Sequence, residues 1–273
     1  MDKRHPARPE SGLGKLLRQW RETRGKSQLD LALETGVSQR HISFIESGRS
    51  TPSREKLMDI ADGLNVPLRE RNTLLIAAGY APVHGEVPLD APEMASIVKV
   101  LTRLLRQHEP FPAVVMDRYW NVIMTNEAAP VFFGKFIDMA SRASPRNLLH
   151  LMFDPDGMRP FISDWRAVSE SLLARVYREA VGSVVDEKTM ELINALLSYP
   201  DGRGEKGPTM PFATPLLPMT PIGFVRNGRA LNYFSMITTV GTPQTITAQE
   251  IRVECMYPAD DLTEAEHRRL MEP

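Results

Sequence analysis

The sequence predicts two domains of different class, an all-α domain of five short helices followed by an α+β domain. In residues 11–80, apolar residues recur every three or four positions in five short segments, most of them bounded by serine, glycine or proline. Beyond residue 93, helical spacing alternates with short runs of β-branched and aromatic residues. One of these runs ends at Asn227-Gly228, a strong signal for a two-residue hairpin turn.

The composition is that of an ordinary globular protein, because 42% of its 273 residues are hydrophobic and 25% are charged. The single cysteine, Cys255, excludes an intramolecular disulfide and fits a reducing, cytoplasmic location. The sequence contains neither a signal peptide nor an apolar run long enough to cross a membrane, so no membrane association is expected. Residues 1–80 carry 14 Lys and Arg against 10 Asp and Glu, whereas the remainder carries 19 against 24. A basic front and an acidic rear favour one domain that faces nucleic acid and one that does not.

The front segment places helix signals at regular intervals. The first helix carries Leu13, Leu17 and Trp20 and is expected to end at Gly25. The second and third are expected to begin after Ser27 and Ser38, with a tight turn at Gly36 between them. A fourth helix is expected to start near Ser53, and a fifth after Pro67.

Residues 27–49 therefore form a helix, a turn and a second capped helix, which is the arrangement that seats one helix in the major groove of DNA. At the start of that second helix, Gln39 and Arg40 match the side chains that pair with adenine and guanine. Phe44 either contacts a thymine methyl or a sugar, or packs on a neighbouring helix. His41 either touches a phosphate or is solvated. The candidate DNA-binding residues are Gln28, Ser38, Gln39, Arg40, His41, Ser43, Phe44 and Arg49.

This segment resembles the Xre family of regulators, which are related to the lambda repressor. The resemblance is carried by Gln28, by Gly36, by Ser38-Gln39-Arg40 and by the run 45–49, IESGR. It implies a lambda-repressor-like domain in which Gln28 contacts a phosphate. It also implies that Arg21 pairs with Glu46, the alternative being an exposed Glu46 near Arg49.

Three prolines and a glycine in residues 81–93 indicate a linker. Residues 94–258 form the rear domain, and residues 259–273 are interpreted as a C-terminal tail. In the rear domain, residues 94–107, 160–182 and 186–198 are expected to be helical. Residues 113–125 are expected to form a hairpin, and strands are expected at 222–226, 229–240 and 246–257.

The hairpin DRYWNVIMTNEAAPVFFG, with Asn126 opening the next helix, resembles the entry of a PAS-like sensor domain. The order of elements, Trp165-Arg166 and the helix SLLARVYREA resemble the ligand-binding domain of MmyB-like Xre regulators. That resemblance implies a fatty-acid-like ligand, with Arg166 or Arg175 as alternatives for its carboxylate. The expected pocket lies among residues 120–136, 160–180 and 229–240, although plain core packing explains the same apolar residues. The candidate ligand-binding residues are Trp120, Phe132, Phe133, Trp165, Arg166, Leu172, Val176 and Tyr177.

No hydrolase, P-loop or metal-site motif is present, so the sequence favours a protein that is not an enzyme and carries neither a cofactor nor a metal. The expected partners are double-stranded DNA, a small apolar ligand and a second copy of the chain. Two alternatives remain open. The rear domain serves only to dimerise or to bind a protein, or the chain is an enzyme with a DNA-binding front.

Overall fold

The structure is a computed structural model that describes residues 12–142, 144, 146–181, 186–200 and 221–272. It divides into two compact units. The N-terminal unit takes in the chain up to Glu86, and the C-terminal unit takes in nearly all of the rest, from Val87 onward.

The N-terminal unit consists of the five predicted helices, which are thereby confirmed. They are α1 (Gly12–Thr23), α2 (Gln28–Thr35), α3 (Gln39–Glu46), α4 (Arg54–Gly63) and α5 (Leu68–Ala77). Their apolar stripes meet in one core, whose fully buried members include Trp20, Leu31, Ile45, Leu57 and Leu75. Burying such side chains contributes about 1.5–3 kcal/mol each and fixes the helices against one another.

Local signals set where these helices begin and end. Ser27, Ser38 and Ser53 each accept a hydrogen bond from a backbone amide in the first turn of the helix that follows. Gly36 lies between α2 and α3 with a φ of +67°, a left-handed conformation that side chains with a Cβ rarely adopt. The turn is therefore specified by the sequence.

The C-terminal unit is built on one antiparallel sheet in the order β2-β1-β5-β4-β3. The strands are β1 (Ala113–Met116), β2 (Val122–Thr125), β3 (Ile222–Arg226), β4 (Arg229–Thr239) and β5 (Arg252–Pro258). The sheet confirms the predicted α+β class. It also joins the expected hairpin to the expected later strands, because β1 pairs with β5 in the register Ala113↔Cys255.

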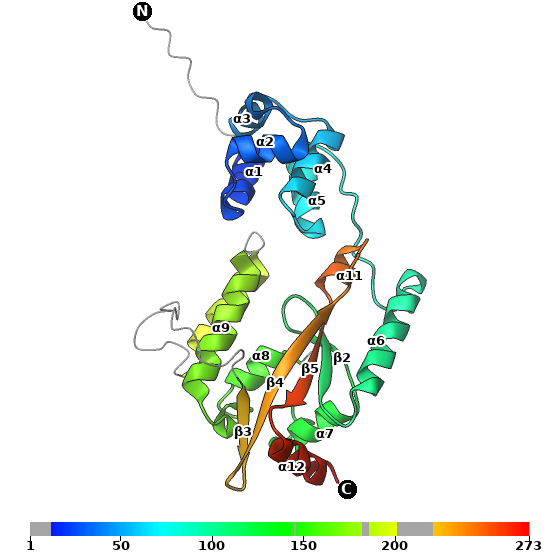
Figure 1. Ribbon diagram of the computed structural model, residues 1–273, viewed down its shortest axis with the longest axis vertical. Helices are drawn as coiled ribbons and strands as arrows, with labels where there is room; N and C mark the ends of the chain where they lie inside the picture. Colours follow the sequence, from blue (N-terminus) through cyan, green and yellow to red (C-terminus); the bar gives the residue numbers. More distant parts are fainter. Residues whose placement is uncertain (1–11, 143, 145, 182–185, 201–220, 273) are drawn as a thin grey trace, which may run out of the picture. The chain divides into compact units, whose positions relative to one another are not determined.

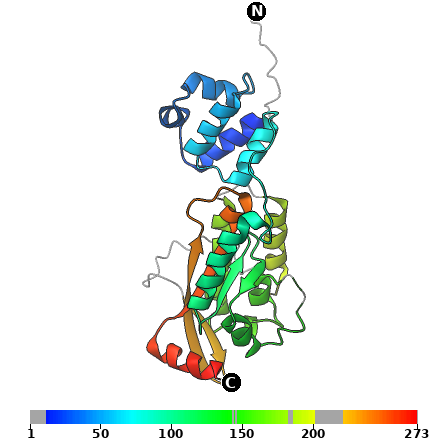
Figure 2. The ribbon, with the colours of Figure 1, turned by 90° about the vertical axis from the view of Figure 1, so that its right-hand side faces the viewer.

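Helices cover both faces of this sheet. On one face, α6 (Ala95–Gln107) packs over Val115, Val253 and Cys255. The other face carries Val114, Met116 and the helices α7 (Ala128–Gly134), α8 (Leu148–Phe153), α9 (Trp165–Val181) and α10 (Glu187–Ser198). Figure 1 shows α6 and α9 on opposite sides of the sheet, and Figure 2 shows α6 running along its face. We call these the α6 face and the α9 face.

Three expectations for this unit are corrected. Residues 246–250 form a short helix, α11 (Ile246–Glu250), and not the start of a strand. Ala248 and Ile251 are both buried on the α6 face, and a spacing of three suits a helical turn, whereas strand alternation would put them on opposite faces. The helix expected from residue 160 begins at Trp165, after a 3-10 turn at Arg159–Phe161.

The third correction concerns the segment 259–273, interpreted from the sequence as a tail. It forms α12 (Asp261–Met271), capped by Asp260 and lying beside β4 and β5 (Figure 1). Its His267 is fully buried and its Thr263 nearly so. The sequence signal for α12 is weak, because most of the helix is charged, as a solvated tail would be. Only the two inward residues and a few apolar neighbours indicate a packed helix.

Candidate functional site

Each helix of the predicted helix-turn-helix begins with a serine cap, and the cap of α2 is reciprocal. The Ser27 side chain accepts from the Asp30 amide at 3.1 Å, and the Asp30 carboxylate accepts from the Ser27 amide at 2.9 Å. These bonds hold the pKa of Asp30 below its ordinary value. Ser38 caps α3 with a single bond, accepting from the His41 amide at 3.3 Å.

The predicted DNA-binding residues lie on α3, beside its two ends and at the start of α2. Ser38, Gln39, Arg40 and Arg49 are exposed, whereas Gln28, His41, Ser43 and Phe44 are partly buried. The remaining side of α3 is inward, because Ile42 and Ile45 are 2% and 1% exposed. The exposed set thus includes the two residues at the N-terminal end of α3, which is the end that reaches base edges in this motif.

Phe44 lies between two arginines. The guanidinium carbon of Arg40 is 5.2 Å from the centre of the Phe44 ring, and that of Arg49 is 5.9 Å away. Each contact is a cation–π interaction that favours the charged group over the ring face. Neither arginine has a salt bridge to another residue that the structure describes. The outcome is a positive surface organised around an aromatic ring, suited to a polyanion.

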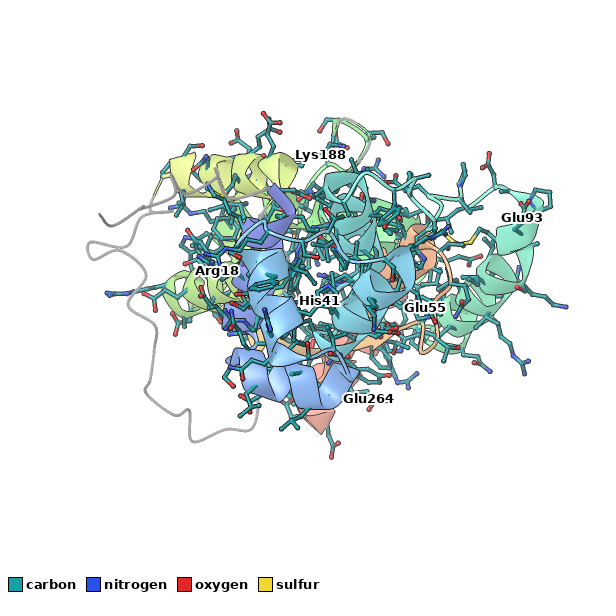
Figure 3. All side chains as sticks on the ribbon, turned by 90° about the horizontal axis from the view of Figure 1, so that it is seen from above. Arg18, His41, Glu55, Glu93, Lys188 and Glu264 are labelled. Carbon is teal, nitrogen blue, oxygen red and sulfur yellow. The ribbon has the colours of Figure 1, made fainter. Side chains whose placement is uncertain are left out.

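Behind α3, a buried carboxylate ties the motif to the rest of its domain. Glu46 is 2% exposed and accepts from Arg21 at 2.6 and 3.0 Å and from the Gln28 amide at 2.9 Å. Arg18, labelled in Figure 3, lies 3.6 Å away. Burial alone would raise the pKa of Glu46, but the bonds from Arg21 and Gln28 outweigh it and hold that pKa low. The Arg21–Glu46 pair implied by the family resemblance is confirmed, and the exposed alternative is wrong.

Two of the candidate residues are more constrained than the sequence suggested. Gln28 gives one amide hydrogen to Glu46, so a phosphate contact from Gln28 would use the second hydrogen. The Nε2 atom of His41, labelled in Figure 3, is buried and has no hydrogen-bond partner among the described residues. In this conformation that nitrogen is not available to a phosphate.

Most of the predicted ligand-binding residues meet in one apolar cluster on the α9 face. Trp120, Phe132, Phe133, Leu172 and Val176 are buried there, and Trp165 and Tyr177 pack against them half-buried. They pack against one another and against other side chains of this cluster. Arg166 is the exception, because its side chain is 83% exposed and pairs with Glu170 on the outer side of α9. Arg166 therefore does not join the other predicted ligand-binding residues in this cluster.

Arg175, the other arginine considered for a carboxylate, points inward. Its guanidinium carbon lies 4.1 Å from the centre of the Trp120 ring. Its Nε and Nη1 atoms donate to Glu179 and Glu254 at 3.0 and 3.1 Å. The remaining Nη2 is buried and has no hydrogen-bond partner among the described residues. Helical periodicity distinguishes the two arginines, because Arg175 lies close to the buried stripe of Leu172 and Val176.

An apolar groove lies on the opposite face of the sheet. It has a volume of about 310 Å³ and is lined by α6, by the end of β4 and by β5. None of the predicted ligand-binding residues lines it. The sequence indicated a helix at residues 94–107 through the apolar stripe of Ile97, Leu101 and Leu104, but no pocket beside it. The signal that marks the groove is Val100, an additional apolar residue that remains 62% exposed.

Other chemistry-bearing groups are few in the described part of the chain. Cys255 is buried on the α6 face, and burial raises the pKa of its thiol, as expected of an apolar strand residue and not of a nucleophile. Across the described ranges, histidine, cysteine and carboxylate side chains do not gather into a group of three that would hold a metal ion. No described helix combines the length and apolar character needed to cross a membrane.

Comparisons with known proteins cover both units. Residues 97–270 match the family model described as MmyB-like transcription regulator ligand binding domain, and residues 17–71 match the one described as helix-turn-helix. Uncharacterized HTH-type transcriptional regulators of Mycobacterium bovis and Mycobacterium tuberculosis are 37% identical to this chain over 65 residues. That match covers 24% of this chain and 25% of each relative.

Proposed function

The chain belongs to the family of transcription regulators with an MmyB-like ligand-binding domain, here joined to a helix-turn-helix domain, and from this premise we propose a DNA-binding regulator controlled by a small apolar ligand. The observation that carries the DNA-binding part is the surface of α3. It presents Gln39 and Arg40 at its N-terminal end beside a Phe44 ring that is flanked by two arginines.

All of the candidate residues except His41 have a definite role in this proposal. Gln39 and Arg40 read base edges, because their side chains can pair bidentately with adenine and guanine. Arg49 and the second amide hydrogen of Gln28 contact phosphates, which fixes the register without reading sequence. Phe44 supports the Arg40 and Arg49 guanidinium groups and meets a thymine methyl or a sugar. Ser38 and Ser43 lie beside these contacts and complete the surface.

Selection of bound duplexes from a randomised pool tests this part. The full-length protein is expected to enrich a short motif. Gln28→Ala is expected to weaken binding to the selected duplex while leaving the enriched motif unchanged. A protein that enriches no motif, or a Gln28→Ala variant that enriches a different one, would contradict the assigned roles.

We also propose that the regulator binds DNA as a homodimer. One short recognition helix spans too few base pairs to specify a site, and two-fold dimers that read two half-sites are the common solution. The expected result is an enriched motif with two-fold symmetry and a complex of two chains per duplex by native mass spectrometry. A complex of one chain on the best enriched duplex would contradict the proposal.

The ligand is proposed to be fatty-acid-like and to bind in the C-terminal unit. Support comes from the MmyB-like family and from the apolar groove in that unit. An apolar chain gains about 0.8 kcal/mol for each buried CH₂ group, so it needs few polar contacts. Organic extraction of the purified protein, followed by mass spectrometry, is expected to release an amphipathic acid that changes affinity for the selected duplex. Extracts that leave this affinity unchanged would favour a C-terminal unit that serves dimerisation or protein binding.

A further inference from the structure

The groove on the α6 face has the lining of a site for an apolar molecule. Ile97, Val100 and Leu104 form its α6 side, and Thr238 and Val253 lie on the strands opposite. Its volume of about 310 Å³ falls at the lower end of the range for small-molecule sites, roughly 300–1,000 Å³. Val100 contributes an exposed apolar side chain at its rim.

A row of cations follows the groove along the same helix. Lys99, Arg103 and Arg106 are exposed, and they border a second hollow on α6 together with Thr102 and Gln107. Within the part of the chain that the structure describes, none of the three cations has a salt bridge. Residues three and four apart are neighbours on a helix, so Arg103 adjoins both Val100 and Lys99. The apolar lining and the cations therefore meet at Val100 and Arg103.

The geometry points to an anionic amphiphile as the occupant of this groove. We propose that its apolar body lies between α6 and strands β4 and β5, and that its anionic group is held by Arg103 and its basic neighbours. The inference rests on the proposed ligand-controlled function and identifies where that ligand binds. It places the ligand on the opposite face of the sheet from the aromatic cluster around Phe132.

A molecule in this groove would act on a helix that is close in the chain to the N-terminal unit. α6 is the first α-helix after Glu86, where that unit ends. A ligand in the groove contacts both α6 and the sheet. It therefore favours the position of α6 in which both sets of contacts can form. The resulting change in DNA affinity cannot exceed the difference in the ligand's affinity for the two states of the protein.

A pair of valine substitutions tests the location of the site. Val100→Glu places a carboxylate in the groove, whereas Val131→Glu makes the same change at an exposed valine on α7, which is 45% exposed. The probe is 8-anilinonaphthalene-1-sulfonate, whose fluorescence rises in apolar sites, measured on full-length variants with matching thermal unfolding midpoints. Val100→Glu is expected to weaken probe binding about tenfold or more, because a carboxylate at the rim repels the sulfonate and replaces an apolar contact with the body of the probe. Val131→Glu is expected to leave it within about twofold.

A second pair of variants tests the anionic group. Arg103→Gln with Arg106→Gln is compared with Arg178→Gln, which removes an exposed cation from α9. The double variant is expected to weaken sulfonate binding several-fold at low salt and to leave binding of uncharged N-phenyl-1-naphthylamine unchanged. Arg178→Gln is expected to change neither. Equal loss of both probes would overturn the role of the cations.

The outcomes separate this inference from the proposed function. If Val100→Glu binds the sulfonate as wild type does, the groove is not the site, whether or not a ligand controls DNA binding elsewhere in the unit. If Val100→Glu converts dimers to monomers without affecting probe binding, the groove is an interface between copies and the inference fails. If the probes bind as expected but extracted ligand leaves DNA affinity unchanged, the site stands and ligand control fails.

Discussion

Glu46 shows how a single residue fixes α3, the proposed recognition helix. It is the last residue of α3, and its carboxylate receives Arg21 from α1 and Gln28 from α2. One buried charge thus joins α3 to both α1 and α2. The pairing is costly to break, because removal of one partner leaves the other charge buried and uncompensated.

Glu46→Ala is therefore expected to lower the free energy of opening of α3 by about 3 kcal/mol, since Arg21 is only 11% exposed and would lose its carboxylate. Amide hydrogen exchange in the full chain measures this quantity. The matched control is Glu34→Ala, which breaks the more exposed pair with Lys26 and should cost less than about 1 kcal/mol. Similar losses in the two variants would show that Glu46 does not hold the motif together.

At the scale of elements, the crossing of α1 over α3 depends on one glycine. A Cβ placed on Gly14 would lie 2.4 Å from the Glu46 carbonyl oxygen and 2.9 Å from that of Ile45. These atoms are backbone, so the helices themselves would have to separate. A Cβ on Gly12, in the same helix, would point into open space, because no heavy atom of the described residues beyond its own helical neighbours lies within 4 Å.

Gly14→Ala is accordingly expected to destabilise the N-terminal unit by about 1–3 kcal/mol through overpacking, even though alanine favours a helix by about 1 kcal/mol. Gly12→Ala is expected to be neutral or slightly stabilising. Thermal unfolding of the two variants, followed by circular dichroism, compares them directly. A Gly14→Ala variant as stable as the wild type would mean that α1 and α3 are not held this close.

α12 is attached to the sheet through a buried histidine. The Tyr233 hydroxyl lies 2.7 Å from Nδ1 of His267, and Nε2 of His267 lies 2.9 Å from the Pro110 carbonyl oxygen. Because a carbonyl only accepts, Nε2 carries the hydrogen, and neutral Nδ1 accepts from Tyr233. Burial is the main cause that lowers the pKa of His267, to which Arg268 and His108 add, whereas the Pro110 bond and Glu264 act in the opposite direction.

A lowered pKa means that the folded state binds the His267 proton more weakly than the unfolded state does. The stabilisation is therefore complete above about pH 6.5 and is lost as the pH falls from there through the folded-state pKa. The thermal unfolding midpoint of the C-terminal unit is therefore expected to decrease when the pH is lowered from about 7.5 to about 5.5. His267→Gln should make this decrease smaller. His108 and His150, whose pKa values are also lowered by burial, account for the remainder. An unchanged pH dependence in His267→Gln would contradict this account.

Elements with local signals could be predicted from the sequence, and elements fixed by distant contacts could not. Ser27, Gly36 and Ser38 mark α2, the turn and α3 within a few residues of themselves. The pairing of β1 with β5 joins segments far apart in the chain, so the sequence indicated a hairpin and later strands but not one sheet. The β-branched residues at 245–247 imitate a strand, and α11 forms because Ala248 and Ile251 share one buried side.

The candidate sites follow the same rule. The residues of α3 that are proposed to face DNA depend on the period of one short helix, which the sequence reveals. A pocket depends on which faces of the helices and the sheet remain uncovered after the elements pack together. The periodicity of apolar residues cannot tell whether an apolar helix face is buried in the core or lines a pocket. The groove on the α6 face emerges only from the folded sheet, whereas helical periodicity already favours the inward direction of Arg175.

At the scale of the whole molecule, the two units divide the proposed work. The N-terminal unit carries the surface for DNA, and the C-terminal unit carries the groove for a ligand. The ligand can change DNA affinity only by as much as its own binding free energy differs between the DNA-binding state and the other state of the protein. A tenfold change in DNA affinity therefore needs a difference of about 1.4 kcal/mol. All of this rests on α3 as a helix that reads base sequence.

Fluorescence anisotropy of a labelled duplex tests that claim most directly, with wild type and Arg40→Ala titrated onto the selected duplex and onto a shuffled one. We expect the wild type to bind the selected duplex about 10³-fold or more tightly than the shuffled one. Arg40→Ala should lose about 1–3 kcal/mol on the selected duplex and far less on the shuffled one. Equal weakening on both duplexes would make Arg40 a phosphate contact, and a wild type without preference would contradict the central claim.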